Sequence, residues 1–185
     1  MTEREAVDML RTGRAEGLEF LVAEHELMAL RLAYTILGDR ASADEAVAEA
    51  FLKVYRHIDR FEAGRPFRPW FLKIVSNEAL GMARRARRAE RLWSLLGRQA
   101  GAPPDPVEQA ETNELRREVI AAVRALPPNE RTAVTLRYLL DLDERSVAET
   151  LGWPLGTLKT RLHRARIRLR EQLGGEAPLT GRSSA

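Results

Sequence analysis

The sequence predicts an all-α protein in which two small helical domains are joined by a flexible linker. Apolar residues recur at the three- and four-residue spacing of amphipathic helices, and the alternation typical of β-strands is nearly absent. The segment GRQAGAPPDP, residues 97–106, interrupts this pattern with three prolines and two glycines. The 185 residues suffice for two small domains, and a content of 44% apolar and 31% charged residues favours a folded chain.

Two helices are predicted before residue 60. The first spans residues 18–37, and Gly38 is placed to end it. The second begins with Ser42 as its N-cap, and Glu45 three residues later completes a capping box. The apolar stripe of this second helix consists of Val47, Phe51, Val54 and Ile58.

The segment RFEAGRPFRP, residues 60–69, breaks the helical pattern because Gly64, Pro66 and Pro69 are unfavourable inside a helix. We expect the helix to resume at Trp70 and to continue into the arginine-rich stretch ARRARRAERL. Trp70 and the apolar residues after it have helical spacing, so they are expected mostly in the core.

The proline-rich segment sets the domain boundary. The first domain comprises residues 1–96, the linker residues 97–106, the second domain residues 107–173, and a polar tail residues 174–185. In the second domain Pro127 and Pro128 end one helix and start the next. The later helices are expected at residues 131–140, 143–151 and 155–173, with a turn at residues 152–154.

Basic side chains gather in two blocks, although the net charge of the chain is only +3. Residues 64–98 hold 9 basic and 2 acidic side chains, and residues 152–173 hold 6 basic and 1 acidic. Two basic blocks separated by an acidic stretch indicate two contacts with a polyanion such as a nucleic acid. The alternative interpretation is that both blocks are ordinary solvated helix faces.

The second basic block lies in PLGTLKTRLHRARIRLR, residues 154–170. On a helical wheel one sector of this segment is apolar and is expected to face the core, while the opposite side is cationic. The apolar sector comprises Leu155, Leu158, Leu162, Ala165 and Leu169. The preceding segment DERSVAETLGWP adds a short helix and a glycine turn, and the whole is typical of a helix-turn-helix that reads the DNA major groove. An α-hairpin with a basic exposed face is the alternative.

Two stretches of the chain resemble a known family. The stretch LPPNERTAVTLRYLLDLDERSVAETLGWPLGTLKTRLHRARIRLREQL is similar to region 4 of bacterial RNA polymerase sigma factors of the extracytoplasmic-function (ECF) class. The stretch AYTILGDRASADEAVAEAFLKVYRHIDRFEAGRPFRPWFLKIVSNEALGMARRARR resembles region 2 of the same class. The resemblance covers roughly residues 15–92 and 107–173. It implies a factor that directs transcription initiation through two helical domains.

Region 4 of that family reads the minus-thirty-five element of a promoter. The resemblance implies that the last helix contacts base edges and phosphates, to which arginine and lysine are chemically suited. The implied contact residues are Thr157, Lys159, Thr160, Arg161, His163, Arg164 and Arg166. Arg168 is expected to contact a phosphate or a neighbouring acidic side chain.

Region 2 of the family opens DNA at the minus-ten element and holds a flipped base. The loop FEAGRPF, residues 61–67, corresponds to the base-capturing loop, in which Arg65 would supply charge and Phe67 a stacking surface. The resemblance implies minus-ten contacts by Phe61, Arg65, Phe67, Asn77, Arg84, Arg85 and Arg88.

The helix SADEAVAEAFLKVY corresponds to the face that binds polymerase in this family. Its implied contact residues are three acids and an apolar ridge, namely Asp44, Glu45 and Glu49 with Val47 and Phe51. The implied partners are core RNA polymerase, through the clamp helices and flap of its large subunits, promoter DNA and an anti-sigma factor. The chain departs from the family pattern at Ala48, Gly81 and Trp153, where glutamine, aspartate and a smaller aliphatic residue are common.

Composition argues against several other classes. The chain has no cysteine, and its three histidines lack the spacing of metal ligands, so we expect neither a metal nor a cofactor. The N-terminus lacks an apolar signal region, and no apolar run approaches the roughly 20 residues of a membrane span. We therefore expect a cytoplasmic protein without direct membrane insertion, held at the membrane only through an anti-sigma factor.

The sequence leaves two alternatives to an initiation factor, a DNA-binding regulator and an enzyme. A helix-turn-helix regulator that binds duplex DNA without joining polymerase would need only the second domain. An enzyme is disfavoured because the sequence offers no nucleophile–base pairing and no phosphate-binding glycine loop. The paired acids Asp44/Glu45 and Asp143/Glu144 are better interpreted as helix-start charges.

Overall fold

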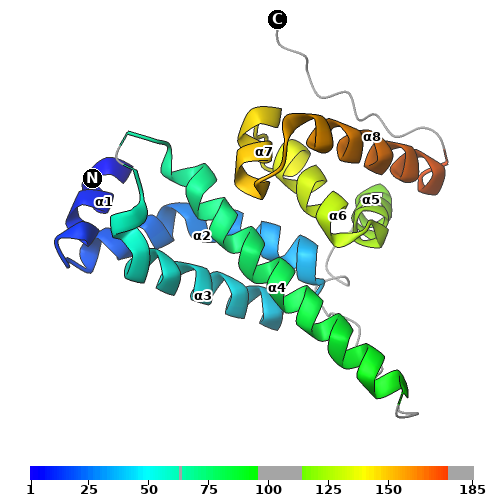
Figure 1. Cartoon of the computed structure of the whole chain (residues 1–185), viewed down its shortest axis with the longest axis horizontal. Coiled ribbons are helices and arrows are strands. Elements are labelled where there is room, and N and C mark those ends of the chain that lie inside the picture. Colours follow the sequence, from blue (N-terminus) through cyan, green and yellow to red (C-terminus); the bar gives the residue numbers. More distant parts are fainter. Residues whose placement is uncertain (63, 96–113, 175–185) are drawn as a thin grey trace, which may run out of the picture. The chain divides into compact units, whose positions relative to one another are not determined.

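The computed structural model describes residues 1–62, 64–95 and 114–174 of the chain. Within these residues every regular element is a helix and no strand is present, which confirms the all-α fold class. The chain divides into two compact units, Met1–Ala89 and Glu90–Ala185, which are described separately below (Figure 1). The predicted linker, the predicted start of the second domain at residue 107 and residues 175–185 of the predicted tail lie outside the described residues.

The first unit contains four helices and one short 3-10 turn. These are α1 (Glu3–Arg11), α2 (Glu16–Leu37), α3 (Arg40–His57), the turn η1 (Ile58–Arg60) and the first part of α4 (Phe67–Leu95) (Figure 1). Within the described residues no helix is long and apolar enough to cross a bilayer.

An aromatic cluster joins three of these helices. Phe71 of α4 lies 4.6 Å, ring centroid to ring centroid, from Phe51 of α3, and Phe67 lies 5.3 Å from His25 of α2. Phe67 and Phe71 also stack on each other with an interplanar angle of 12°. Burial of each phenylalanine contributes about 1.5–3 kcal/mol, so the cluster fixes the start of α4 against α2 and α3.

The caps of α2 and α3 differ in part from the prediction. Gly38 adopts a left-handed conformation with φ 89° and ends α2, as expected. The N-cap of α3 is Asp39, whose carboxylate accepts a 2.8 Å hydrogen bond from the Ser42 backbone nitrogen. The predicted capping box of Ser42 and Glu45 is therefore wrong, because the aspartate directly after the glycine starts the helix three residues earlier.

Helix α4 also starts earlier than the sequence predicts. The helix begins at Phe67 rather than at Trp70, and Pro69 lies in its first turn. The backbone nitrogens of a first turn have no acceptor within the helix, so a proline there removes no hydrogen bond. The true break in the helical pattern is therefore shorter than predicted and ends at Pro66.

The second unit contains α5 (Glu114–Ala125), α6 (Pro128–Val134), the π-helical segment η3 (Thr135–Leu139), α7 (Glu144–Leu151) and α8 (Leu155–Gln172). Pro127 is the N-cap of α6 and Pro128 its first residue, as the double proline suggested, so the helix begins three residues before the predicted Arg131. Asp143 caps α7 by accepting a 2.9 Å hydrogen bond from the Ser146 backbone nitrogen. Gly152, left-handed with φ 67°, closes α7 before the turn into α8.

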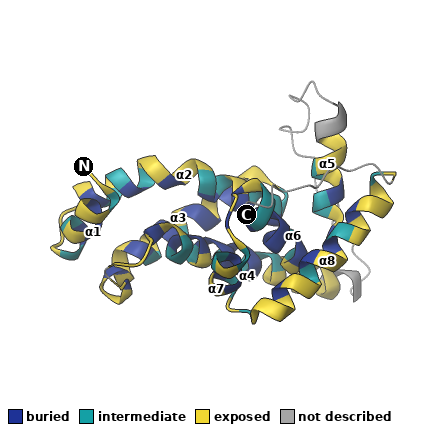
Figure 2. Cartoon of the chain, turned by 90° about the horizontal axis from the view of Figure 1, so that it is seen from above, coloured by how far each residue is buried: buried dark blue, intermediate teal, exposed yellow. Residues whose placement is uncertain are grey.

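The helices are amphipathic, with one side buried and the other exposed (Figure 2). In α8 the buried side is the predicted sector, apart from its first member. Leu155 is 43% exposed, because a helical wheel gives a direction but not whether another element lies there. The sector that packs against α6 and α7 consists of Leu158, Leu162, Ala165 and Leu169.

His25 is a buried base within the aromatic cluster. His25 is only 8% exposed, and its Nε2 atom makes no hydrogen bond among the described residues. A carboxylate oxygen of Glu3 lies 3.8 Å from this Nε2 atom. Burial lowers the pKa of His25 below its ordinary value of 6.5, and Arg68 acts in the same direction, while Glu3 and Glu24 oppose them. The folded protein therefore favours the neutral imidazole of His25 more than the unfolded chain does.

We predict that this histidine makes the protein less stable in mild acid. Because the pKa of His25 is lower in the folded than in the unfolded state, its neutral form stabilises the fold fully above pH 6.5. This stabilisation is lost as the pH falls from 6.5 through the folded-state pKa. Urea unfolding followed by circular dichroism on either side of this range measures the change in unfolding free energy.

The variant His25→Leu should lose part of that pH dependence, whatever its absolute stability. His57 is exposed, so His57→Gln should keep the dependence of the original chain. An identical loss of stability with falling pH in the original chain and in His25→Leu would contradict the prediction.

Candidate nucleic-acid interface

Helix α8 presents a cationic face on the side opposite its buried leucines. Among the seven predicted contact residues, Arg161 and Arg166 are half-buried and the others are exposed. The exposed five are Thr157, Lys159, Thr160, His163 and Arg164. The structure thus brings all seven onto one helix that follows directly from the glycine turn of α7.

Some of these side chains are held by neighbours. The Arg161 guanidinium lies 4.6 Å from the centre of the Trp153 ring, and such a cation–π contact is worth about 0.5–1 kcal/mol at an exposed site. The Lys159 ammonium lies 3.8 Å from the Glu144 carboxylate at the start of α7. These contacts restrict the two cations before any ligand binds, and Trp153, a departure from the family pattern, supplies one of them.

Arg168 has a different partner. Its guanidinium donates a 2.5 Å hydrogen bond to the carboxylate of Glu130 on α6. Glu130 is only 7% exposed, so its charge depends on this arginine for compensation. Of the two roles expected for Arg168, the structure shows the contact with an acidic side chain, which ties α8 to α6.

Helix α4 carries the second cationic face. Arg84, Arg85 and Arg88 are all exposed, as is Asn77. Asn77, Arg84 and Arg88 are spaced seven and four residues apart, so they lie on one side of the helix. Gly81 lies between them, and a Cβ there would approach only the guanidinium groups of Arg85 and Arg84, at 3.6 and 3.9 Å. Both distances are ordinary van der Waals contacts, so packing around position 81 would accommodate a side chain.

The two phenylalanines predicted to contact the minus-ten element are buried in this structure. Phe67 is 2% exposed and Phe61 is 6% exposed, so neither ring offers a free face on which a base could stack. Both belong to the aromatic cluster, in which Phe61 packs edge-on against Phe67 at 5.7 Å. Arg65 is exposed, as expected, and its guanidinium lies 2.7 Å from the Glu62 carboxylate.

The predicted polymerase face of α3 is exposed only in its acidic part. Asp44 and Glu45 are exposed and Glu49 is half-buried, but Val47 and Phe51 are core residues at 4% and 7% exposure. The side chains of the predicted apolar ridge thus pack inward in this structure, and their contact with polymerase stays a prediction. The exposed apolar side chains of α3 are Leu52 and Tyr55, at 45% and 49%. Leu52 lies away from the buried stripe and Tyr55 at its edge, and this helical spacing was the signal that could have found them.

Comparisons with known proteins bear on both units. The model of the family described as Sigma-70 region 2 matches residues 21–89, and that described as Sigma-70, region 4 matches residues 116–169. The ECF RNA polymerase sigma factor SigE of Mycolicibacterium smegmatis is 32% identical over 166 residues, which cover 89% of this chain and 64% of that protein. The ECF RNA polymerase sigma-E factor of Escherichia coli is 30% identical over 179 residues, covering 90% of this chain and 91% of that protein.

A solved structure agrees with the fold. The sigma factor RpoE of Bartonella quintana, crystallised with the anti-sigma factor NepR, has a TM-score of 0.67 at 24% identity, covering 86% of this chain and 99% of that one. With both region models matched in order, and with a 30% identical relative covered almost in full, this chain belongs to the ECF family of RNA polymerase sigma factors. Helix α1 lies before the matched residues.

We predict that Arg168 and Arg164 of α8 have separable roles. Arg168→Met leaves the buried Glu130 carboxylate without its charged partner, so it should lower the unfolding free energy by about 1–3 kcal/mol. Arg164→Met removes an exposed charge, so it should leave stability nearly unchanged but weaken binding to duplex DNA. It should also reduce the slope of log binding constant against log salt concentration by about one, because one fewer phosphate is neutralised.

Urea unfolding and titration of a labelled duplex at several salt concentrations measure the two effects, with each variant serving as the control for the other. Weaker DNA binding by Arg168→Met at unchanged stability would mean that Arg168 acts on DNA rather than on Glu130.

Proposed function

We propose that this protein binds core RNA polymerase and directs it to promoters with two elements, one contacted by each unit. The observation that carries the proposal is that each unit matched by a sigma-region model presents an exposed cationic helix face, on α4 and on α8. DNA offers a regular array of phosphates, and two separate cationic faces match two separate promoter contacts.

Helix α8 is proposed to read the minus-thirty-five element in the major groove. Arg164 and His163 are exposed on its polar face and suit base edges or adjacent phosphates. Arg161 is proposed to contact a phosphate. Because Trp153 already restricts its guanidinium, Arg161 loses less conformational entropy on binding than a free side chain would. Each bidentate contact between an arginine and a guanine would give about 1–3 kcal/mol of discrimination.

The first unit is proposed to hold the opened minus-ten element. Arg84, Arg85 and Arg88 would follow the backbone of the strand, and Arg65 would contact it from the loop before α4. Trp70 is half-buried and thus more exposed than Phe61 and Phe67, against which its ring packs with centroid distances of 5.1 and 5.6 Å. It can therefore offer the stacking surface that the buried Phe67 does not.

The exposed face of α3 is proposed as a polymerase contact. It combines the acids Asp44 and Glu45 with the exposed Leu52 and Tyr55, while Val47 and Phe51 hold the helix in place from behind. A patch with apolar residues beside charged ones is typical of protein–protein interfaces. Ala48 is exposed on the same side, so the glutamine common in the family is replaced there by a side chain without hydrogen-bonding groups.

Control by an anti-sigma factor is part of the proposal. The sigma factor RpoE of Bartonella quintana was crystallised with the anti-sigma factor NepR, and it shares this fold. Such a partner would occlude the faces described above, and it could hold the protein at a membrane without any insertion of this chain. The protein itself is proposed to act in the cytoplasm by binding, with no chemical step of its own.

Reconstituted transcription tests the proposal. The purified protein is mixed with bacterial core RNA polymerase and DNA from upstream of its own coding region, and any transcript start is mapped. We expect a discrete start only when both proteins are present. The alternative, a helix-turn-helix regulator, predicts no association with core polymerase but salt-sensitive binding to duplex DNA, and that result would displace the sigma-factor proposal.

We predict that Leu52→Glu weakens association with core polymerase at least about tenfold, because it places a charge in an apolar part of the contact. The fold should persist, since Leu52 is already 45% exposed. The matched control is Leu52→Met, which keeps an apolar side chain of similar volume and should bind as the original chain does. Association is measured by fluorescence anisotropy of the labelled protein, and equal binding by both variants would exclude Leu52 from the contact.

A further inference from the structure

Helix α1 is anchored to α2 by direct contact between their backbones. Gly17, near the start of α2, lies so close to α1 that a Cβ there would overlap the backbone oxygen of Ala6 and lie 2.9 Å from the backbone nitrogen of Leu10. Ala6, Val7 and Leu10 form the buried side of α1. Any side chain at position 17 would therefore push α1 away from α2.

The N-terminus of α1 is fixed as well. Thr2 accepts a 3.2 Å hydrogen bond from the Glu5 backbone nitrogen, and the Glu5 carboxylate accepts a 2.8 Å bond from the Thr2 nitrogen. This capping box satisfies two of the helix's first donors. Helix α1 is therefore a rigid attachment on the first unit, although it lies before the residues matched by the region 2 model.

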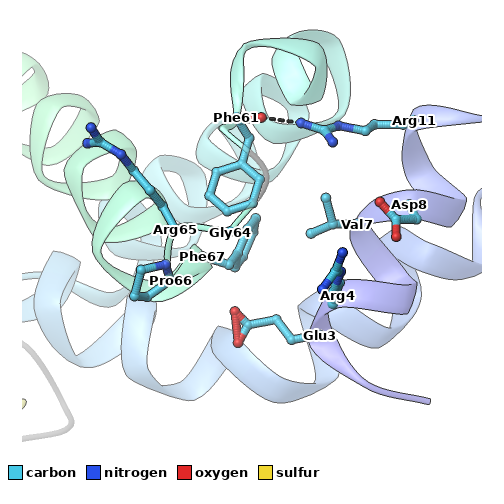
Figure 3. A pocket seen from close by; sticks show the side chains of 10 residues that line it. All are labelled: Glu3, Arg4, Val7, Asp8, Arg11, Phe61, Gly64, Arg65, Pro66 and Phe67. Atoms are coloured by element: carbon cyan, nitrogen blue, oxygen red, sulfur yellow. Dashed lines mark hydrogen bonds between the residues drawn. The ribbon is translucent and has the colours of Figure 1, made fainter.

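From the last residue of this anchored helix, a side chain reaches the loop before α4. The guanidinium of Arg11, half-buried, donates a hydrogen bond to the backbone oxygen of Phe61, fifty residues further along the chain (Figure 3). Phe61 is the first residue after η1, and its own nitrogen donates to the Ile58 oxygen at 3.0 Å. Arg11 thus holds the loop where it leaves the turn.

A cavity of about 430 Å³ separates the rest of α1 from the loop (Figure 3). One wall consists of Glu3, Arg4, Val7, Asp8 and Arg11 of α1, and the other of Phe61, Gly64, Arg65, Pro66 and Phe67. Helix α1 and the loop are connected in two ways within the described residues. The turn η1 packs on α1, and Arg11 donates a hydrogen bond to the Phe61 backbone oxygen. Removal of Arg11 would leave the Phe61 carbonyl without its hydrogen bond to the anchored helix, while η1 would still pack on α1.

We propose that Arg11 is a positioning residue that fixes the backbone of the loop at Phe61, where the segment that captures the unpaired minus-ten strand begins. This inference rests on the proposed function. Arg11 need not touch DNA, because it acts through the Phe61 carbonyl. A fixed loop would bind the strand without first losing conformational entropy, so loss of the tie should weaken capture specifically.

The test uses holoenzyme assembled from the full chain and core RNA polymerase. The probe is a fluorescent single-stranded oligonucleotide of the minus-ten region upstream of the mapped transcript start. Arg11→Met, which keeps an apolar stem but removes all donors, should weaken probe binding about tenfold, and Arg11→Lys should weaken it less. Gly17→Ala displaces α1 by an independent route and should reproduce the loss.

The matched control is Arg14→Met, which makes the same change in an exposed arginine whose partner is the exposed Glu16. It should bind the probe as the original chain does. Core association and binding of a minus-thirty-five duplex should be unchanged in every variant. Failure of the original holoenzyme to initiate at all would count against the sigma-factor proposal rather than against Arg11.

The proposal is overturned if Arg11→Met binds the probe within twofold of the original chain, or if Arg14→Met loses as much binding. It is also overturned if Arg11→Met loses core association together with probe binding, because Arg11 would then support the whole unit rather than position the loop.

Discussion

Each long helix of this protein must bury one apolar face, and that constraint decides which polar faces remain available to partners. In α8 the burial of Leu158, Leu162 and Leu169 turns Arg164 and His163 outward. In α3 the burial of Val47 and Phe51 turns Leu52 and Tyr55 outward beside the acids. The helical spacing of apolar residues therefore determines both which side chains pack in the core of a unit and which remain on its surface for partners.

Two groups of arginines in this chain have different roles. Arg11 and Arg131 donate hydrogen bonds to backbone oxygens, and Arg168 pairs with a buried carboxylate. A second group, Arg84, Arg85, Arg88 and Arg164, is exposed on the two cationic helix faces. Arginine serves both tasks because its planar group offers five donors and keeps its charge at any physiological pH.

The aromatic cluster of the first unit fixes the start of α4 and contains an ionisable side chain, His25. Phe67 and Phe71 position the start of α4, and the loop proposed to hold DNA leads directly into that start. His25 lies against both rings and remains neutral because burial disfavours its charged form. The same packing that fixes the end of the loop at the start of α4 therefore buries Phe67.

Much of the architecture could be predicted from the sequence. Periodicity gave the all-α class, Gly38 and Gly152 marked helix ends, and the leucine spacing of residues 158–169 gave the buried side of α8. Local chemistry was less reliable at helix starts, where Asp39 displaced Ser42 as the cap and Pro69 lay inside a first turn. In both cases several residues could start the helix, and the choice depended on backbone geometry.

By itself the sequence determined the helices other than α1 (Glu3–Arg11), their amphipathic faces and the two cationic blocks, because these depend on spacing along a single helix. Only the tertiary structure decided which residues of a face have partners from distant segments. It paired Arg168 with Glu130, tied Arg11 to Phe61, and buried Phe67 while exposing Leu52. The reason is that these contacts join residues far apart in the chain, whose distances depend on how the helices pack against one another.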